Sequence, residues 1–396
     1  MSLAADPIVI VSAVRTAMGG FLGELAGLTA AELGAAAIAE AVKRAGVAPD
    51  DIDTALMGCV LQAGQGQAPA RQAALGAGLS QGVECTTFNK MCGSGMQALI
   101  LGHDQLLAGS SQVLVAGGME SMSNAPYLLN RARAGLRMGH AQMLDHMFLD
   151  GLEDAYERGR LMGTFAEDCA EQYGFSREAQ DAYALESLRR AQTAMADGSF
   201  VGEIVSVEAP IGRERRQVAA DEQPPKAQPE KILSLKPAFR QGGTVTAANA
   251  SSISDGAAAL VLMRQSEAAR RGLTPLARIC SHAGFAHAPN LFTTAPVFAI
   301  EKLLARTGWS LESVDLFEIN EAFAVVPMVA MRELGIAHER VNVHGGACAL
   351  GHPIGASGAR IVVTLLAALA QRGLSRGVAA VCIGGGEATA LAVELI

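Results

Sequence analysis

The chain shows the same order of strand and helix patterns twice, near its beginning and at its end. Apolar, β-branched runs alternate with helical periodicity from Ile8 to Gly118, and again from Leu276 to Leu395. The agreement extends to detail, since Ala116-Gly117-Gly118-Met119-Glu120 is echoed by Ile383-Gly384-Gly385-Gly386-Glu387. Alternating strands and helices favour a mostly parallel sheet that helices cover on both faces. The repetition therefore predicts an α/β protein built from two similar halves.

Each half is expected to contain the same elements in the same order. We expect strands at 8–14, 55–58, 83–88, 113–118 and 257–263 in the first half, and at 276–280, 314–319, 341–343, 378–383 and 391–395 in the second. Helices are expected from the cap residue Thr29 to Gly46, at 69–75, 96–107, 176–195, 296–306 and 357–369, with another ending at Leu334.

Residues 121–244 interrupt this rhythm. Arginines cluster at Arg131, Arg133 and Arg137, and the proline-containing stretch 223–237 is typical of a loop. We therefore predict an inserted loop domain at 121–244. The first half then consists of 1–120 and 245–272, and the second half of 273–396.

Composition narrows the class of protein. A net charge of -8 argues against nucleic acid as a partner, and no apolar stretch has the length of a membrane span. Residues 1–7 lack the basic and apolar regions of a leader, so a cytoplasmic location is expected. Seven cysteines without paired or short ligand spacing predict neither a disulfide framework nor a metal site.

Cys92 is the first candidate for chemistry. It lies in Asn89-Lys90-Met91-Cys92-Gly93-Ser94-Gly95, between a strand pattern and a helix pattern, so we expect a strand-to-helix elbow. Free N–H groups and the positive end of the dipole at a helix start favour the nucleophilic thiolate. The alternative is a small, buried, unreactive cysteine. The glycines on both sides favour the functional interpretation.

Three segments of the second half can supply partners. His352 lies in a Gly-rich loop before a helix, at the position that corresponds to Cys92, where it could take the thiol proton or stabilise an oxyanion. Cys382 ends a strand, and the glycine run that begins at Gly384 follows it. The backbone N–H groups of this run could form an oxyanion hole, with Cys382 acting as a base. The alternative is a simple tight turn after a buried strand. Asn320 also follows a strand and could hold a water molecule. A structural histidine and a zinc site are the rival interpretations of this set.

These segments resemble the motifs of the thiolase family. Asn89 to Met96 is similar to its nucleophile motif, Asn320-Glu321-Ala322-Phe323 to its asparagine motif, 351–358 to its histidine motif and 382–386 to its second-cysteine motif. Residues 242–251 and 254–258 also look like segments of this family, and the resemblance covers essentially the whole chain.

The resemblance implies the thiolase fold: two βαβαβαββ halves in α-β-α-β-α layers, with an inserted domain that covers coenzyme A and contributes to tetramer contacts. It implies that Cys92 carries an acetyl group from acetyl-CoA, that His352 takes the thiol proton and that Cys382 removes an α-proton from a second acetyl-CoA. Asn320, through a water molecule, and His352 would form one oxyanion hole, and the backbone N–H groups of Cys92 and Gly384 the other. The product would be acetoacetyl-CoA, with coenzyme A released and no further cofactor.

The resemblance also implies a channel for the pantetheine arm and a homotetramer, a dimer of dimers. The channel positions are Met162, Leu235, Phe239, Ala247, Ser251, Ala322 and Phe323.

Some positions depart from the family pattern. Leu161 stands where many short-chain members have a histidine. Pro224-Pro225-Lys226 lies where an arginine often meets the nucleotide, and Lys226 or Lys231 could substitute for that arginine. Phe292-Thr293 resembles half of a Phe-Pro pair that some relatives with branched substrates carry. Acyl chain length therefore stays open, and a degradative 3-ketoacyl-CoA thiolase is the alternative.

Two interpretations come from other classes of protein. A condensing enzyme acting on acyl carrier protein would be expected to have a second histidine in place of Cys382. A nucleotide-binding module would explain the glycines alone, but the phosphate-loop pattern is absent from the sequence.

Overall fold

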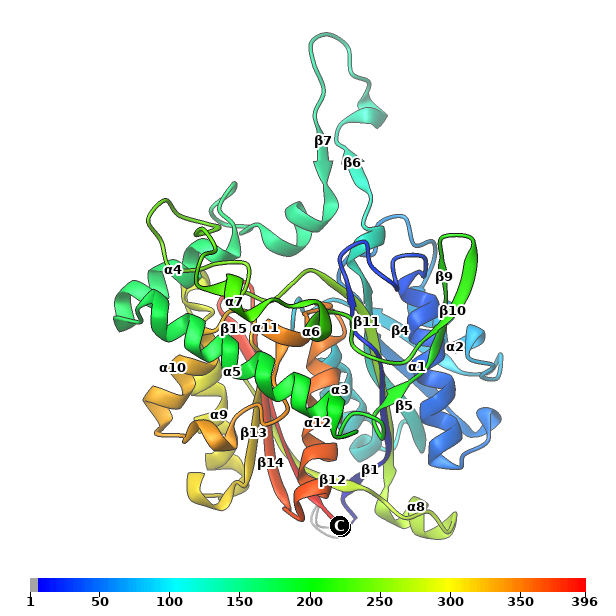
Figure 1. Ribbon diagram of the computed structural model, residues 1–396. Helices are drawn as coiled ribbons and strands as arrows, with labels where there is room; N and C mark the ends of the chain where they lie inside the picture. The colour runs from blue at the N-terminus through cyan, green and yellow to red at the C-terminus, as the bar shows by residue number, and fades with distance from the viewer. Residues whose placement is uncertain (1–5) are drawn as a thin grey trace.

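Eleven strands form one sheet in the computed structural model, which describes residues 6–396 (Figure 1). The main path has the order β13-β14-β15-β12-β1-β11-β5-β3-β4, with β2 paired to β11 and β8 paired to β1. The strands are β1 (Ile8–Thr16), β2 (Gly19–Gly20), β3 (Thr54–Gly58), β4 (Glu84–Phe88), β5 (Val113–Ser121), β8 (Ile204–Val205), β11 (Ser254–Arg264), β12 (Ala277–Ala286), β13 (Leu316–Ile319), β14 (Arg376–Ile383) and β15 (Glu387–Leu395).

The order of the strands shows the predicted duplication. One half of the sheet runs β1-β11-β5-β3-β4 and the other runs β12-β15-β14-β13, so each strand of the second half has a counterpart in the first. The two halves join where Val9 faces Arg278 and Ile10 faces Ala277. The expected mostly parallel sheet is wrong, because β11 and β15, the second strand of each half from the junction, run antiparallel to both of their neighbours, and β1 and β12 pair antiparallel at the junction. β15 follows β14 through a short glycine turn, which can only reverse the chain.

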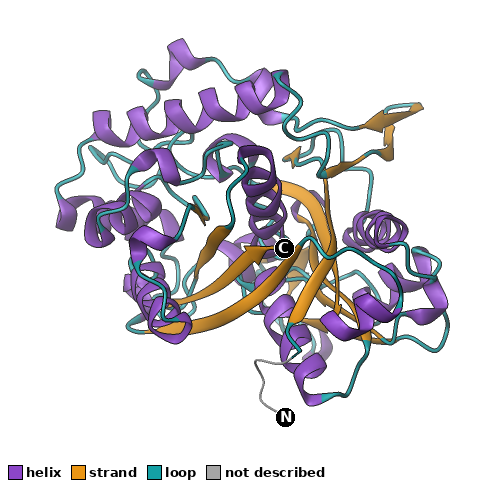
Figure 2. Ribbon diagram, turned by 90° about the horizontal axis from the view of Figure 1, so that it is seen from below, coloured by secondary structure: helices purple, strands orange, loops and turns teal. Residues whose placement is uncertain are grey.

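Helices cover both outer faces and fill the centre (Figures 1 and 2). α1 and α2 pack on the first half of the sheet, α9 and α10 on the second, and α3 and α12 lie between the two halves. This confirms the expected α-β-α-β-α layers. The helices are α1 (Ala30–Ala45), α2 (Pro69–Gly76), α3 (Ser94–Ala108), α4 (Met162–Tyr173), α5 (Arg177–Ala196), α6 (Gln223–Lys226), α7 (Pro229–Ile232), α8 (Gln265–Arg270), α9 (Ala295–Thr307), α10 (Val325–Leu334), α11 (Ala347–Leu350) and α12 (Ser357–Arg372).

Local chemistry explains where these helices begin and what they bury. Thr29 and Glu32 form a capping box at the start of α1, and Gly46 ends that helix with a left-handed φ of 68°. α12 is buried on nearly all sides from Ser357 to Leu369, as expected of a helix with apolar residues around its whole circumference.

The strand expected at 341–343 is wrong. Val341 makes only an isolated parallel bridge to Phe317, and Asn342 has a left-handed φ of 49°. The Asn342 side chain makes the hydrogen bonds that a neighbouring strand would make to Ile319. Its Oδ1 accepts from the Ile319 N–H at 2.8 Å, and its Nδ2 donates to the Ile319 carbonyl at 2.8 Å.

The chain between β5 and β11 holds α4 to α7 and two small hairpins. β6 (Tyr127–Leu129) pairs with β7 (Met143–Asp145) in a hairpin that projects from the body (Figure 1), and β9 (Val207–Ile211) pairs with β10 (Glu214–Val218). The Pro-containing stretch expected as a loop instead forms the single turns α6 and α7, since proline fits the first turn of a helix. The domain boundaries at 120/121, 244/245 and 272/273 stay predictions.

Two expectations from composition can be compared with the described residues. All seven cysteines are free, which confirms that they form no disulfide framework. In the part of the chain that the structure describes, no helix has the length and apolarity needed to cross a membrane. Residues 1–5, part of the stretch in which no leader is expected, lie outside the described residues.

Candidate active site

The predicted elbow before α3 is confirmed. β4 ends at Phe88 and α3 begins at Ser94, and Met91 turns the chain with a left-handed φ of 47°. Ser94 holds the turn closed, because its Oγ accepts from the Lys90 N–H at 2.8 Å and donates to the Met91 carbonyl at 2.7 Å. Cys92 is thereby fixed just before the first turn of a helix.

Backbone N–H groups favour the Cys92 thiolate as expected, but they do not decide the ionisation of the thiol. The backbone N–H groups of Gly384 and of Cys92 itself lower the pKa of the thiol, but burial outweighs them and raises its pKa to about 11. The helix start therefore does not ionise this cysteine by itself. A base has to remove the thiol proton when the sulfur reacts.

His352 has the chemistry for such a base, and its surroundings fix which ring nitrogen is free. Its Nδ1 lies 2.6 Å from Ser357 Oγ, and the Ser357 hydroxyl donates to the Pro353 carbonyl at 2.9 Å. The hydroxyl can then only accept from the ring, so Nδ1 carries the proton and Nε2 has a free lone pair. Burial lowers the pKa of His352 to about 3, so the ring is neutral.

Asn320, at the end of β13, lies next to this imidazole. Its Nδ2 is 3.5 Å from His352 Nε2, while its Oδ1 is buried and has no hydrogen-bond partner within residues 6–396. A buried polar atom of this kind is ordinarily satisfied by an ordered water molecule. The amide can thus hold water beside the histidine.

Cys382 and Gly384 come from the end of β14. Cys382 is almost fully buried, and burial, followed by the proximity of Cys92, raises its pKa well above the ordinary value. The chain then turns through Gly385 and Gly386, whose φ angles of 96° and 85° favour glycine. This turn leaves the Gly384 N–H directed at the Cys92 sulfur.

A cavity of about 360 Å³ brings these groups together. Cys92, His352 and Gly384 line it, whereas Asn320 and Cys382 lie outside its lining, Asn320 beside His352 and Cys382 near Cys92. Six of the seven expected channel residues also line it: Met162, Phe239, Ala247, Ser251, Ala322 and Phe323. Leu235 lines a neighbouring cavity that shares Ala247 and Ser252 with the first.

Part of the apolar wall was missed by sequence reasoning. Phe148 and Leu152 come from a π-helical turn in the insertion, and Ile354 follows His352. Phe148 and Leu152 belong to no pattern that points to a site, so only the fold reveals them, whereas Ile354 lies within the histidine motif 351–358. Leu161 and Phe292, noted in the sequence for other reasons, complete the wall.

Glu120 was also missed by sequence reasoning. Its carboxylate accepts from the backbone N–H groups of Val60, Leu61 and Gly355 at 2.9 to 3.1 Å, so it ties the chain after β3 to the histidine loop. Burial raises its pKa to about 7 despite these bonds. The only signal in the sequence was its place in the repeated Gly-Gly-Met-Glu stretch.

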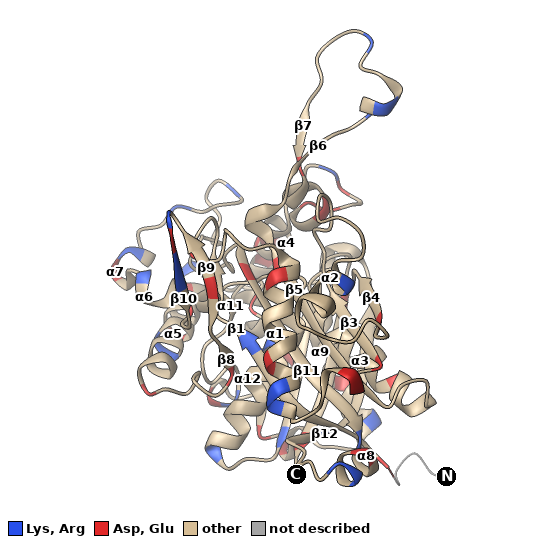
Figure 3. Ribbon diagram, turned by 90° about the vertical axis from the view of Figure 1, so that its right-hand side faces the viewer, with Lys and Arg blue, Asp and Glu red and all other residues tan. Residues whose placement is uncertain are grey.

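The neighbouring cavity, of about 320 Å³, carries positive charge. Lys226 and Lys231 line it, on the short helices α6 and α7 (Figure 3). Lys226 pairs with Glu222, and no ion pair of Lys231 is found within residues 6–396. Within residues 6–396, one group of side chains lies close enough together to hold a metal ion, and this group, His103, Asp104 and His282, lies outside both cavities.

The chain matches known proteins along its whole length. Residues 8–266 match the family described as thiolase, N-terminal domain, and residues 273–395 match the thiolase, C-terminal domain. An acetyl-CoA acetyltransferase of Schizosaccharomyces pombe is 48% identical over 98% of this chain and 99% of its own length. One from Escherichia coli is 50% identical over 98% of each chain.

Solved structures agree. The acetyl-CoA acetyltransferase of Bacillus anthracis has a TM-score of 0.96 at 42% identity, covering 99% of each chain. A thiolase from Ascaris suum, in complex with coenzyme A, has a TM-score of 0.93 at 42% identity and covers 98% of this chain and 100% of its own. With both domains matched and relatives near half identity over full length, the chain belongs to the thiolase family.

Proposed function

We propose that the chain is an acyltransferase that reversibly condenses two molecules of acetyl-CoA to acetoacetyl-CoA and coenzyme A. The observation that carries the proposal is the shared cavity of Cys92, His352 and Gly384, because it places a thiol, a neutral imidazole and backbone N–H groups around one reacting position. Relatives named acetyl-CoA acetyltransferase, near half identical over the full chain, support the same reaction.

In the first half of the reaction, Cys92 Sγ attacks the acetyl-CoA carbonyl while His352 Nε2 takes the thiol proton. The raised pKa of Cys92 and the lowered pKa of His352 disfavour an ion pair between the two side chains, so proton transfer accompanies the attack. The Gly384 and Cys92 N–H groups stabilise the oxyanion that forms on the carbonyl. Cys382 gives its proton to the departing coenzyme A sulfur and is left as a thiolate.

In the second half, the Cys382 thiolate removes an α-proton from a second acetyl-CoA. Its enolate oxygen is stabilised by the protonated His352 and by a water molecule held on Asn320. The carbanion then attacks the acetyl group on Cys92 and forms the new carbon–carbon bond. Cys92 leaves as a thiolate and recovers its proton from His352, so all three groups return to their starting forms.

Coenzyme A would span both cavities. The pantetheine arm fits the apolar walls of Phe239 and Phe323, and the phosphates of the nucleotide end fit Lys226 and Lys231. This assigns to the two lysines the role that an arginine has in many family members.

The two alternative reactions are not favoured. Cys382 stands where a condensing enzyme acting on acyl carrier protein would be expected to have a histidine. The degradative 3-ketoacyl-CoA reaction on longer or branched chains differs only in substrate, so its test is a comparison of chain lengths.

The proposal includes a homotetramer built around the β6–β7 hairpin. Tyr127, Met138 and Met143 on and between these strands expose most of their apolar surface, Met138 all of it. Exposed apolar side chains on a projecting hairpin fit an oligomer contact. Light scattering of the full chain should give four copies, and Met138→Asp with Tyr127→Asp should give a smaller particle. An unchanged mass in the double variant would refute this contact.

The reaction is tested by coenzyme A-dependent cleavage of 3-ketoacyl-CoA thioesters of increasing length. The unmodified chain should cleave the four-carbon substrate fastest, and Cys92→Ser and Cys382→Ser should each lose this activity. Cys280→Ser, on β12 outside the cavity, is the matched control and should keep it. Faster cleavage of longer chains would establish the degradative alternative, and activity that survives loss of Cys382 would refute the two-cysteine mechanism.

A further inference from the structure

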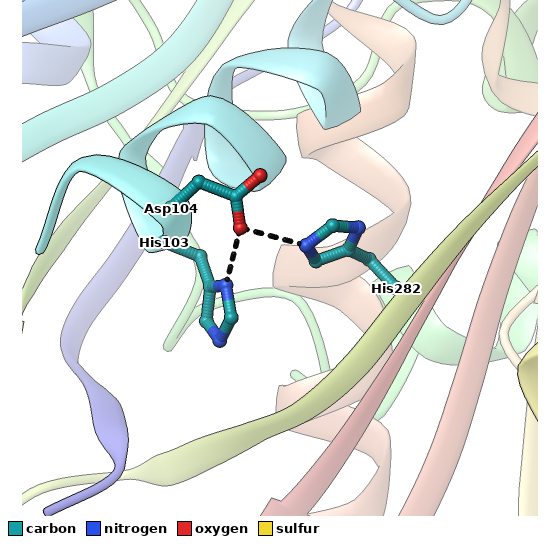
Figure 4. A group of neighbouring side chains, drawn as sticks. All are labelled: His103, Asp104 and His282. Atoms are coloured by element: carbon teal, nitrogen blue, oxygen red, sulfur yellow. Dashed lines mark hydrogen bonds and ion pairs between the residues drawn. The ribbon is translucent and has the colours of Figure 1, made fainter. Parts of the chain in front are cut away.

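We infer that His103, Asp104 and His282 form a binding site for a divalent transition-metal ion of the Zn²⁺ type. Asp104 Oδ1 lies 3.0 Å from His103 Nδ1 and 3.0 Å from His282 Nε2 (Figure 4). The three candidate ligand atoms lie within 4.8 Å of one another. Two imidazole nitrogens therefore face the same carboxylate oxygen, and the three candidate ligand atoms form one compact group.

These distances fit a metal ion. Zinc binds imidazole nitrogen and carboxylate oxygen at about 2.0 to 2.2 Å in a tetrahedron, which places its ligands about 3.3 Å from one another. The two contacts of Asp104 are already close to that separation. The two histidine nitrogens lie within 4.8 Å of each other, so the ion would draw them together by at most about 1.5 Å and would replace the ring protons that now face Asp104 Oδ1.

The burial of the three residues fits an ion with an open position. The His103 and His282 side chains are only 12% and 20% exposed, so the rings are held in place by their surroundings. The Asp104 side chain is 53% exposed, which leaves solvent free to complete the coordination. Three protein ligands plus water is a common arrangement around zinc.

The position in the fold indicates what the ion would do. His103 and Asp104 lie on α3 in the first half, and His282 lies on β12 in the second half. At about 1.5 Å per residue, His103 lies about 13 Å along α3 from Ser94, whereas Cys92 lies just before the start of this helix. The ion would link the two halves of the molecule without taking part in the acyl transfer.

The surroundings of His282 support a fixed site. Arg306 donates to the His282 backbone carbonyl at 2.6 Å, which anchors this part of β12 to α9. The His103 and His282 rings meet edge to face, with centroids 5.2 Å apart and planes at 83°. No short spacing marks the group in the sequence, since 178 residues separate Asp104 from His282 and the site forms only when α3 meets β12.

The experiment uses the full-length protein, stripped of metal with a chelator and then titrated with ZnCl₂ against a chromogenic zinc indicator. One ion per chain should bind, and His282→Gln and Asp104→Asn should each weaken binding at least tenfold. His140→Gln, a histidine in the projecting hairpin, is the matched control and should bind as the unmodified chain does. Zinc that stays bound in both site variants, or that binds none of the proteins, would overturn the inference.

Two further readouts separate this site from other causes. Co²⁺ in place of Zn²⁺ should give a spectrum without a thiolate charge-transfer band, whereas binding at Cys92 or Cys382 would produce one and count against the site. Zinc should raise the melting temperature of the unmodified chain and of His140→Gln, but not that of His282→Gln. Acyl transfer by metal-free His282→Gln should equal that of the metal-free unmodified chain, which shows that the variant folds.

Discussion

The two halves of the molecule share one plan, yet they carry different chemistry at corresponding places. The loop before α3 presents the thiol of Cys92, and the loop before α12 presents the imidazole of His352. The connection from β5 to β11 takes residues 122–253, whereas that from β14 to β15 takes only Gly384–Gly386. The first connection covers the cavity and the second directs an N–H group into it. The duplicated scaffold thus sets where functional groups can stand, and the connections decide which groups they are.

The largest expected effect comes from removing the thiol of Cys92, the nucleophile that the first half supplies. Cys92→Ser should lower kcat by about 10⁴-fold, because a serine hydroxyl beside a weakly basic His352 is a far poorer nucleophile than a thiol. The measurement is steady-state thiolysis of acetoacetyl-CoA, with a trap for the acetylated enzyme. An acetyl group that still accumulates on the Cys92→Ser variant at the normal rate would show that the nucleophile lies elsewhere.

A smaller effect is expected where the two halves touch. α3 and α12 meet through glycines, and a Cβ at position 358 would lie 2.5 Å from the Met96 backbone nitrogen. Gly358→Ala must therefore push the helices apart, and we expect it to lower the free energy of unfolding by about 2 to 3 kcal/mol. Gly202→Ala, whose Cβ would have no neighbour within 4 Å, is the control for added bulk. Equal urea midpoints for both variants would contradict this close approach.

Most elements could be predicted from the sequence because their signals are local. Thr29 with Glu32 marks the start of α1, and the glycines around Cys92 mark the elbow. The strand at 341–343 could not be excluded, since only the folded partner Ile319 shows that the Asn342 side chain replaces a strand pairing. The direction of β11 depends on where the chain returns after residues 122–253, which no local pattern encodes.

The candidate site follows the same division. The motifs identified Cys92, His352 and Gly384, and the fold brings all three to one cavity. The net pKa of the Cys92 thiol could not be predicted, because its burial depends on residues such as Met147, which comes from the insertion and packs in the same cluster. Long-range packing determines both the ionisation of the Cys92 thiol and the residues of the apolar cavity wall, so neither can be predicted from local sequence patterns.

A subtler difference between the halves lies in two corresponding serines. Ser94 and Ser357 both bond a carbonyl of the preceding loop, but only Ser357 also accepts from a catalytic candidate, His352 Nδ1. Ser357→Ala should lower kcat about tenfold, since the ring loses the bond that fixes its tautomer, with little change in KM. Ser94→Ala is the matched comparison, and its main effect should fall on stability. The pH profile of kcat should change for Ser357→Ala alone, and an unchanged profile would assign Ser357 a purely structural role.

The smallest expected effect is a difference in stability between substitutions at the starts of the outer helices α1 and α9. Thr29 caps α1 by accepting from the Glu32 N–H at 3.2 Å, whereas Thr294 before α9 has no capping bond and donates to the Leu291 carbonyl at 2.9 Å. Thr29→Val should lower the free energy of unfolding by about 1 kcal/mol, because it leaves the first turn of α1 without its side-chain acceptor. Thr294→Val should cost less than about 0.5 kcal/mol, since the Leu291 carbonyl keeps His287 as a donor. Urea midpoints of the two variants measure this difference. An equal loss of unfolding free energy in both variants would mean that the cap of α1 contributes no more than an ordinary hydroxyl bond. Packing against the sheet alone would then fix where this helix begins.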